Sequence, residues 1–563
     1  MTPSGLAPAE QLRAAGVDQN QPNSNCRRGG QCGEEGGCGG GSGGGNNAGA
    51  LPSTPSPPIP AAGTVCMKCR KQEAQLVARG REPMCFPCLH EQLLSKVRNA
   101  VRLYSLLLPG DQLALAFSGG PASATLLHFL AELRNPCTDR PARGKVAFTM
   151  HVIHIDESAA MACIEPSQGS TDEHAAAGGH SASVAAAAQL YCHEPGVQYH
   201  CVPLEAVFDG TPEAAAGQDA AGLQEGQDQQ QSRELQRRQL QHLLAAVSDT
   251  TGRQDLVCHL RTHLLLRTAA ALGCCRMARG DCSTALAARV VAAAAKGCGY
   301  SLAGDVRLVD ARHGRALPPC FLPLREVSSR ELGMLCSHLR LPVARQPAGV
   351  SAAGQRAAKK SINSLADAFI AGMELHNPGS VPNILNTIAK LEAFPWNDPT
   401  ATRTGQTLPQ QQQHGVQQQQ QQRQQEQQQQ QHVEAAVLCP ICLAPLADDE
   451  LPGSDSNHSS SNSGSEHTSG GTGAASAAAA AGCCLSCYCQ ILGGGSEAVV
   501  LAGSGVAAAL PLAVSQRMAS MAMVGSQLVA KEAKAAVVSD GAEPASGGVE
   551  RLRAHIAEFL LDT

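Results

Sequence analysis

Four pairs of cysteines have the spacing Cys-x-x-Cys, at which two thiolates can bind one metal ion. The first two pairs, Cys66/Cys69 and Cys85/Cys88, are separated by fifteen residues. Two pairs at this separation can place four thiolates around one tetrahedral zinc ion. Because the segment between them has too few large apolar residues to fold unaided, we expect a zinc site rather than four unliganded thiols in a small core.

The other two pairs predict a second zinc site near the opposite end of the chain: Cys439, Cys442, Cys484 and Cys487. Cys483 and Cys489 adjoin the last pair, so the sequence leaves open which of these neighbours bind the metal. The opening Cys-Pro-Ile-Cys-Leu resembles the start of a RING finger. A RING finger needs eight ligands including a Cys-x-His pair, and His458 and His467 lie in Ser/Gly-rich sequence, so we reject that interpretation.

A glycine-rich loop follows the apolar run at 113–117 and opens a segment with helical spacing at 122–133. Free N–H groups at the start of a helix attract an anion, and glycines let the backbone approach a phosphate. We expect a phosphate site here rather than only a tight turn, formed by Ser118, Gly119, Gly120 and Ser123, with Asp281 facing it from a later strand. The sequence contains no Walker motif and no G-x-G-x-x-G after a strand. It therefore indicates neither a Walker-type triphosphatase nor a Rossmann dinucleotide site.

Basic residues are concentrated between residues 66 and 102, where eight Lys or Arg accompany three Glu. Lys96, Arg98, Arg102 and, further along, Arg261 are candidates for phosphate contacts, although a solvated basic face explains the local charge equally well. The whole chain has 43 Lys and Arg against 48 Asp and Glu, a net charge of −5. This balance argues against a wholly basic nucleic-acid coat and against a polybasic membrane protein.

A parallel sheet is predicted to position these residues. Apolar runs at 113–117, 146–155, 197–204 and 275–278 predict strands. Helical periodicity predicts helices at 122–133, 256–272, 283–296, 328–339 and 361–391. Strands that alternate with helices indicate a doubly wound α/β fold, in which ligands collect at the carboxyl ends of the strands.

Low-complexity sequence separates the segments that are expected to fold. With 15 aromatic residues, 57 Gly and 33 Pro among 563 residues, the chain cannot build several ordinary cores. We expect a disordered tail at 1–62, a zinc module at 63–100, an α/β domain at 101–396 with disordered inserts at about 157–190 and 211–236, a Gln-rich linker at 397–432, a second zinc module at 433–492 with an insert at 448–482, and an Ala-rich tail at 493–563 with a terminal helix.

The cellular compartment is predicted from the cysteines and from the apolar stretches. The 24 cysteines include four metal-type pairs, and no charged-then-apolar leader opens the chain, which favours a reducing compartment over disulfides. The longest apolar stretch, 498–514, is interrupted by Ser504 and Pro511 and is weak as a membrane span. We therefore expect a soluble, cytosolic protein without a membrane partner.

The order of these parts resembles one family closely, the cytosolic tRNA 2-thiolation proteins, subunit 2. The resemblance includes the first cysteine module, the late Cys-x-x-C pairs and the segments 96–130, 261–274, 280–290, 321–332, 361–385 and 556–562. The loop at 118–123 resembles the S-G-G-x-D-S pyrophosphate loop of the ATP-pyrophosphatase superfamily. The resemblance thus implies a sheet of the adenine nucleotide alpha hydrolase-like (PP-loop) type.

For function, the resemblance implies a heterodimer with a catalytic thiolase subunit. The complex would convert the wobble uridine of cytosolic tRNA for Lys, Glu and Gln to 2-thiouridine, beside a 5-methoxycarbonylmethyl group that is installed separately. Sulfur would arrive as a thiocarboxylate on a ubiquitin-related modifier protein. The phosphates of tRNA, or of ATP, then become the expected ligands of Lys96, Arg98, Arg102 and Arg261, and no DNA partner is implied.

Three departures from the catalytic pattern bear on the chemistry of this chain. Ala122 stands where the pyrophosphate loop has Asp, a single Cys258 stands where catalytic relatives have a C-x-x-C pair, and Asp281 lies in Gly-Asp-Cys instead of G-H-x-x-D-D. They predict a non-catalytic or weakly catalytic subunit for which ATP is a candidate ligand. Two alternatives stay open: an independently active ATP-dependent tRNA ligase, and a zinc-dependent interaction scaffold with a vestigial loop.

Overall fold

The computed structural model describes two compact units, which divide between Leu89 and His90 within helix α2 (Phe86–Leu103). Most of the predicted tails, the Gln-rich linker, the insert at 448–482 and the terminal helix lie outside the described residues. The described residues are 60–61, 63–78, 82–135, 145–164, 173–209, 227–313, 317–344, 361–397, 437–447, 451, 478, 481–493, 509–512, 514–518 and 520.

The first unit contains a small antiparallel hairpin and the first turn of α2. Strands β1 (Leu76–Ala78) and β2 (Glu82–Met84) pair with Leu76 opposite Met84. Leu76, Ala78 and Met84 are buried, together with Cys66 and Cys85. A core of this size is too small to be stable alone, as expected for a module that is completed by a metal ion.

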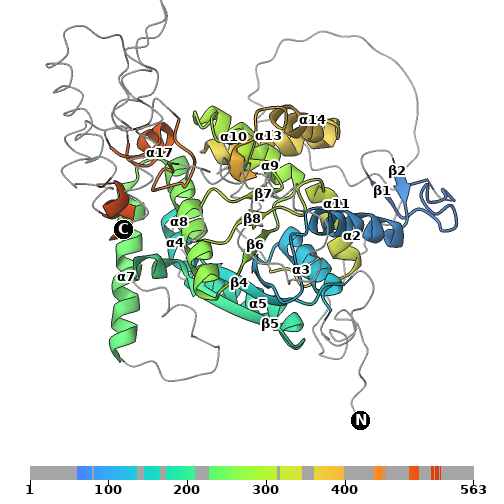
Figure 1. The fold of residues 1–563 in the computed structure, drawn as a ribbon, viewed down its shortest axis with the longest axis horizontal. Helices are drawn as coiled ribbons and strands as arrows, with labels where there is room; N and C mark the ends of the chain where they lie inside the picture. Colours follow the sequence, from blue (N-terminus) through green and yellow to red (C-terminus); the bar gives the residue numbers. More distant parts are fainter. Residues whose placement is uncertain are drawn as a thin grey trace, which may run out of the picture. The chain divides into compact units, whose positions relative to one another are not determined.

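The second unit is built on a six-stranded sheet in the order β5-β4-β3-β6-β8-β7, of which all strands except β3 are labelled in Figure 1. Five strands are parallel, and β7 is antiparallel to its neighbour β8. This arrangement confirms the predicted doubly wound α/β class. The strands are β3 (Gln112–Ala116), β4 (Thr149–Asp156), β5 (Val197–Pro203), β6 (Arg276–Arg279), β7 (Val309–Asp310) and β8 (Cys320–Phe321).

Helices cover the central strands, which explains why those strands read as continuous apolar runs. Leu113, Leu115 and Ile153 are fully buried. None of the described helices is long and apolar enough to cross a membrane. The helices are α3 (Pro121–Leu133), α4 (Ser158–Ile164), α5 (Glu173–Cys192), α7 (Gln227–Ala246), α8 (Thr250–Ala271), α9 (Ser283–Ala295), α10 (Leu302–Asp305), α11 (Ser329–His338), α13 (Ile362–His376), α14 (Ser380–Ile388) and α17 (Leu485–Gln490), with 3₁₀ turns at η1 (Leu204–Phe208) and η2 (Pro395–Asn397).

Helix boundaries follow local sequence signals that periodicity alone did not resolve. The predicted helix at 256–272 begins earlier, at Thr250, because the Asp249 carboxylate caps it by accepting a hydrogen bond from Gly252 N (2.9 Å). The single helical segment predicted at 361–391 is two helices, α13 and α14. The break falls at Asn377-Pro378-Gly379, where proline cannot continue the hydrogen-bond ladder.

The strand order creates a switch point beside the glycine-rich loop. From β3 the chain moves outward through β4 to β5 and then returns past β3 to form β6. The carboxyl ends of β3 and β6 therefore flank the place where the order reverses, which is where such sheets bind ligands. The loop beginning at Ser118 follows β3, and Asp281 follows β6, so both predicted phosphate-site segments lie at this point.

The prediction that 157–190 and 211–236 are disordered inserts was wrong for a large part of both segments. Helices α4 and α5 occupy much of the first, and α7 begins within the second, whereas 165–172 and 210–226 lie outside the described residues. On α5, Val184, Ala187, Ala188 and Tyr191 are buried at helical spacing. Alanine has the highest helix propensity, so the composition that suggested disorder also permits a helix once a partner surface exists.

The second cysteine segment packs directly on α8. Its apolar residues Val437, Ile441 and Leu446 belong to the same buried cluster as Leu260 and Leu264 of the helix. His263 of α8 donates a hydrogen bond from Nε2 to the carbonyl oxygen of Ile441, at 2.9 Å. The predicted separate module therefore shares its core with the α/β domain.

A buried ion pair joins α8 to the helices that follow it. The Lys296 ammonium lies 2.8 Å from Asp255 Oδ2, and the two side chains are only 11% and 12% exposed. Asn363 at the start of α13 accepts from Lys296 Nζ (3.0 Å) and donates to Asp255 Oδ1 (2.8 Å). A buried charge pair is tolerated when further hydrogen bonds satisfy both partners, as they do here.

We expect Lys296→Met to lower the free energy of unfolding by about 3 kcal/mol, because it leaves the Asp255 carboxylate buried without its cation. Urea denaturation of the full chain measures the effect. Lys390→Met is a matched control, since Lys390 is exposed and its loss should cost less than about 0.5 kcal/mol. Equal losses in the two variants would contradict a structural role for the pair.

Candidate metal centres and phosphate loop

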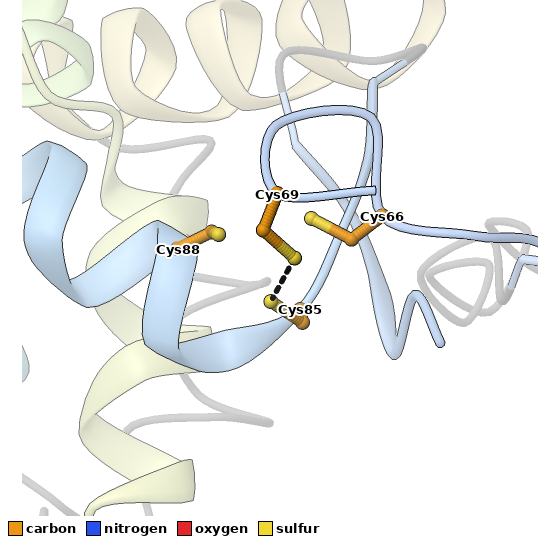
Figure 2. Close-up of side chains that lie close together, drawn as sticks. All are labelled: Cys66, Cys69, Cys85 and Cys88. Carbon is orange, nitrogen blue, oxygen red and sulfur yellow. Dashed lines mark hydrogen bonds between the residues drawn. The ribbon is translucent and has the colours of Figure 1, made fainter. Parts of the chain in front are cut away.

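The first four predicted metal ligands converge on one point. Cys66 and Cys69 lie on one turn, Cys85 directly precedes α2, and Cys88 projects from its first turn (Figure 2). All four Sγ atoms lie within 4.8 Å of one another, and those of Cys69 and Cys85 are 3.8 Å apart. Tetrahedral zinc with Zn–S bonds of about 2.3 Å separates its sulfur ligands by about 3.8 Å. The arrangement therefore fits a single tetrahedral ion.

The second set of four forms the same kind of site. Cys439, Cys442, Cys484 and Cys487 also lie within 4.8 Å of one another, and the Sγ atoms of Cys442 and Cys484 are 3.6 Å apart. The N–H of Cys484 points to the sulfur of Cys439 at 3.4 Å. Within the described part of the chain, the group that could hold a metal ion does not include Cys483 or Cys489, so the predicted set of four remains the candidate.

The two sites share one backbone design. In each, the fourth residue after the first cysteine has a left-handed conformation, with φ of 53° at Arg70 and 59° at Leu443. Its N–H donates to the carbonyl of that first cysteine, Cys66 or Cys439, at 2.8 Å in both cases. A turn of this kind directs both thiols of a Cys-x-x-Cys pair to one side. The repetition of this geometry in unrelated flanking sequence supports metal binding at both places.

The electrostatics of the first cluster favour a cation. Burial raises the pKa of Cys66, but N–H groups of Cys69, Cys85 and Lys68 outweigh that effect and bring the pKa to about 6. Burial and neighbouring sulfurs raise the pKa of Cys88 to about 12. Four thiolates so close together repel one another, and a divalent cation removes that repulsion.

The spacing also distinguishes between kinds of metal centre. Soft thiolate sets select zinc or iron–sulfur clusters. In a four-iron cluster each cysteine binds a different iron, so its sulfur ligands stand further apart than those around one ion. Sulfur atoms 3.6 and 3.8 Å apart match a mononuclear site.

The phosphate loop is shaped by one residue that must be glycine. Gly119 has φ of +73°, and an added Cβ would lie 2.7 Å from Val184 Cγ2 and 2.9 Å from Ala344 Cβ. Its carbonyl accepts a hydrogen bond from Ala344 N (2.9 Å). Gly120 has an ordinary φ of −78° at the N-cap of α3, and a Cβ there would approach only Ser118 Oγ, at 3.5 Å.

The hydroxyls of the loop are connected to each other. Ser123 Oγ donates to the carbonyl of Gly120 (3.0 Å) and lies 3.2 Å from Ser118 Oγ. The first turn of α3 has backbone N–H groups that the helix itself does not use. The structure thus brings together Ser118, Gly119, Gly120 and Ser123 as predicted, in a form suited to an anion.

Asp281 lies next to this loop but is neutralised by two arginines. An added Cβ on its neighbour Gly280 would be 3.1 Å from Ser123 Cα, so the turn after β6 touches the start of α3. The carboxylate lies 2.9 Å from Arg279 Nε and 2.5 Å from Arg289 Nη2. Burial raises the pKa of Asp281, but these cations lower it well below its usual range. Arg279 and Arg289 were not singled out from the sequence, since their positions become evident only once the strand ends are known.

The predicted basic residues occupy two different settings. Arg261 of α8 forms an ion pair with Glu157 at the end of β4, with one N–O distance of 2.9 Å. On α2, Lys96 donates to the carbonyl of Glu326 (2.7 Å), whereas Arg98 and Arg102 lie four residues apart and share a helix face. Arg261 therefore belongs to the carboxyl edge of the sheet, and the others belong to α2.

We expect Gly119→Ala to destabilise the domain by about 1–3 kcal/mol, because alanine is strained at positive φ and would meet Val184. Gly120→Ala should cost less than about 1 kcal/mol. Thermal unfolding of both variants measures the difference. Similar melting temperatures for the two would contradict the described loop conformation.

Cys66→Ser and Cys439→Ser should each reduce bound zinc by about one equivalent per chain, because a serine hydroxyl is a poor substitute for a thiolate ligand. Elemental analysis of the purified full chain measures this stoichiometry. Cys489→Ser is the control, since this exposed cysteine lies outside both groups. Unchanged zinc in either of the first two variants would remove that site from consideration.

Sequence comparisons identify similar proteins. No protein-family model matches the chain. Cytoplasmic tRNA 2-thiolation protein 2 from Oryza sativa subsp. indica is 28% identical over 404 residues, covering 69% of this chain and 74% of that protein. The protein of the same name from Arabidopsis thaliana is 30% identical over 342 residues (59% and 65% coverage), and that from Homo sapiens is 27% identical over 395 residues (63% and 72%).

Among solved structures, the U34-tRNA thiolase NcsA from Methanococcus maripaludis, with its 4Fe-4S cluster, aligns with a TM-score of 0.38 and 17% identity, covering 58% of this chain and 86% of that one. The sequence alignments are the more informative comparison, because they extend over most of the relatives and reach both plants and animals. They confirm the resemblance found in the motifs: the chain has homologues in both plants and animals that are named Cytoplasmic tRNA 2-thiolation protein 2.

Proposed function

We propose that this protein takes part in 2-thiolation of the wobble uridine of cytoplasmic tRNA for Lys, Glu and Gln. The observation that carries the proposal is its similarity, over most of their length, to plant and animal proteins named for this modification. The PP-loop position at the sheet's switch point is consistent with a family whose chemistry uses ATP. The cytoplasm is the proposed compartment, in keeping with the names of the relatives.

In the proposed assignment the chain is a non-catalytic or weakly catalytic subunit of a heterodimer with a catalytic thiolase subunit. Ala122 offers a methyl group where an aspartate would orient a metal-bound phosphate. Asp281, which follows the neighbouring strand β6, is held by Arg279 and Arg289. Cys258 on α8 is a single exposed cysteine, without the second thiol of a redox pair at C-x-x-C spacing. These features support binding rather than adenylation by this chain.

The chain's own residues would contribute positioning. Adenylation of the uridine oxygen by ATP, which releases pyrophosphate, would take place on the partner subunit, and this chain would bind ATP without transferring its adenylyl group. The first-turn N–H groups of α3 and the Ser118 and Ser123 hydroxyls would hold a phosphate, and Arg98 and Arg102 would contact the tRNA backbone. The two cysteine clusters would hold zinc as structural ions that stabilise the segments around them. A thiocarboxylated ubiquitin-related modifier would deliver sulfur to the partner subunit.

The test is mass spectrometry of wobble nucleosides from cells that lack the protein and are complemented with variants. Loss of 2-thiouridine in the deletion, and its return with the wild type, is the expected result. Wild-type levels of 2-thiouridine in the deletion would overturn the proposal. Release of AMP and pyrophosphate by the purified chain with tRNA alone would instead favour an independent enzyme.

Gly120 permits a clean test of the loop. Gly120→Asp and Gly120→Asn both supply a good N-cap and have room for a side chain, but only aspartate places a negative charge where a phosphate would lie. We expect ATP affinity to fall at least tenfold in Gly120→Asp relative to Gly120→Asn. Because catalysis is assigned to the partner, Gly120→Asp should still restore more than half of the 2-thiouridine. Equal ATP binding in both variants would show that the loop is not a phosphate site.

A further inference from the structure

A third group of metal-type ligands lies apart from the two cysteine clusters, on the facing sides of helices α2 and α3. His90 of α2 and His128 and Glu132 of α3 bring their ligand atoms within 4.8 Å of one another. His90 Nε2 is 3.2 Å from Glu132 Oε2. His128 and Glu132 are four residues apart, so they lie one above the other on the same helix face. None of the three was selected from the sequence, and the proposed function does not use them.

We propose that His90, His128 and Glu132 form a binding site for a divalent transition-metal ion of the zinc type. Two imidazoles and one carboxylate are a ligand set that leaves a coordination position open for water. Tetrahedral bonds of about 2.0–2.1 Å place such ligands about 3.4 Å apart, close to the measured 3.2 Å between His90 and Glu132. The ligand atom of His128 lies within 4.8 Å of the other two.

The protonation states suit metal binding at neutral pH. Burial lowers the pKa of His128 from its ordinary value, so its imidazole is neutral and has a lone pair to donate. The hydrogen bond from His90 lowers the pKa of Glu132, so its carboxylate is ionised. Arg98 also contributes to that lowering, but its guanidinium lies 3.4 Å from Glu91, so another carboxylate shares its charge.

The surroundings hold the ligands in place. The Tyr191 hydroxyl lies 3.4 Å from His128 Nδ1, in the manner of the outer partners that orient metal-binding histidines. The ring of Phe129, which is fully buried, lies 5.5 Å from that of His90 in an edge-on arrangement. One side of the site is therefore apolar and rigid, while the Glu132 side chain is 39% exposed and leaves a path for the ion.

Such an ion would cross-link helices α2 and α3, because its ligands come from both. Helix α3 starts at the phosphate loop, so a link to α2 would restrain the element that positions Gly120 and Ser123. The simpler alternative is a contact between His90 and Glu132 alone, without a metal ion. That contact needs neither His128 nor the Tyr191 hydroxyl, and this difference makes the two explanations separable.

The experiment uses the full chain with both cysteine clusters filled with zinc, titrated with Co²⁺. Cobalt bound by two nitrogens and an oxygen shows weak visible bands, whereas cobalt that replaces zinc among thiolates adds strong sulfur charge-transfer absorption. We expect one equivalent of Co²⁺ to bind without the sulfur signal. Glu132→Gln and His128→Ala should weaken this binding at least tenfold, and Tyr191→Phe about tenfold.

His376→Ala is the matched control, because His376 lies exposed on α13 and should leave the titration unchanged. Circular dichroism of Glu132→Gln, a nearly isosteric change at a partly exposed side chain, verifies that the fold is kept. Absence of the additional equivalent in the wild type would overturn the proposal. Its persistence in both Glu132→Gln and His128→Ala would do the same, and would leave only the His90–Glu132 contact.

Discussion

Helix α8 makes apolar, ionic and hydrogen-bond contacts on several sides at once, and the arrangement of much of the second unit depends on these contacts. Its apolar residues pack against the sheet and against the second cysteine segment in one continuous core. Asp255 near its start is neutralised by Lys296, and Arg261 in its middle pairs with Glu157 at a strand end. His263 binds the Ile441 carbonyl, and Arg267 donates to the Asp209 carbonyl at 2.8 Å. A helix with polar partners on so many sides has one permitted rotation about its axis, which fixes the elements around it.

Close backbone contact extends this constraint. A Cβ on Gly252, in the first turn of α8, would overlap the Gln490 carbonyl at the end of α17. The second cysteine cluster is therefore attached through side chains and through backbone that lies against backbone. Metal at this cluster would stabilise α8 as well as its own turn, because ordering the four thiolates also orders the apolar residues between them. In the first unit the corresponding benefit is confined to a smaller core.

What the sequence could predict depended on whether the signal was local. The Cys-x-x-C pairs, the loop after the 113–117 strand and the alternation of strands with helices are local, and each appears in the structure. The partner of Arg261 could not be inferred, because Glu157 reaches it only through the folded sheet. The helical ligand group at His90 and His128 was missed for the same reason: its members are on two helices with no shared motif.

Composition was the least reliable guide. The alanine-rich sequence up to residue 190 suggested disorder, yet Val184 within it lies against Gly119 and closes over the phosphate loop. The segment was misread because its buried helix face consists of one valine, a few alanines and one tyrosine. This face hardly differs in hydrophobicity from the alanine-rich sequence around it. A helix face made of small side chains can pack tightly only when the opposite surface approaches the helix backbone closely.

The contact between Val184 and Gly119 has an evolutionary consequence. Alanine-rich tracts readily gain and lose residues, but each residue inserted within α5 turns all that follows by about 100°. A single insertion between Val184 and Tyr191 would separate the residue over the loop from the residue beside His128, so that one of the two contacts would be lost. Insertions and deletions in this repetitive stretch should accordingly accumulate before Val184. The interval of seven residues that ends at Tyr191 should keep its length, while its alanines exchange freely with other small residues.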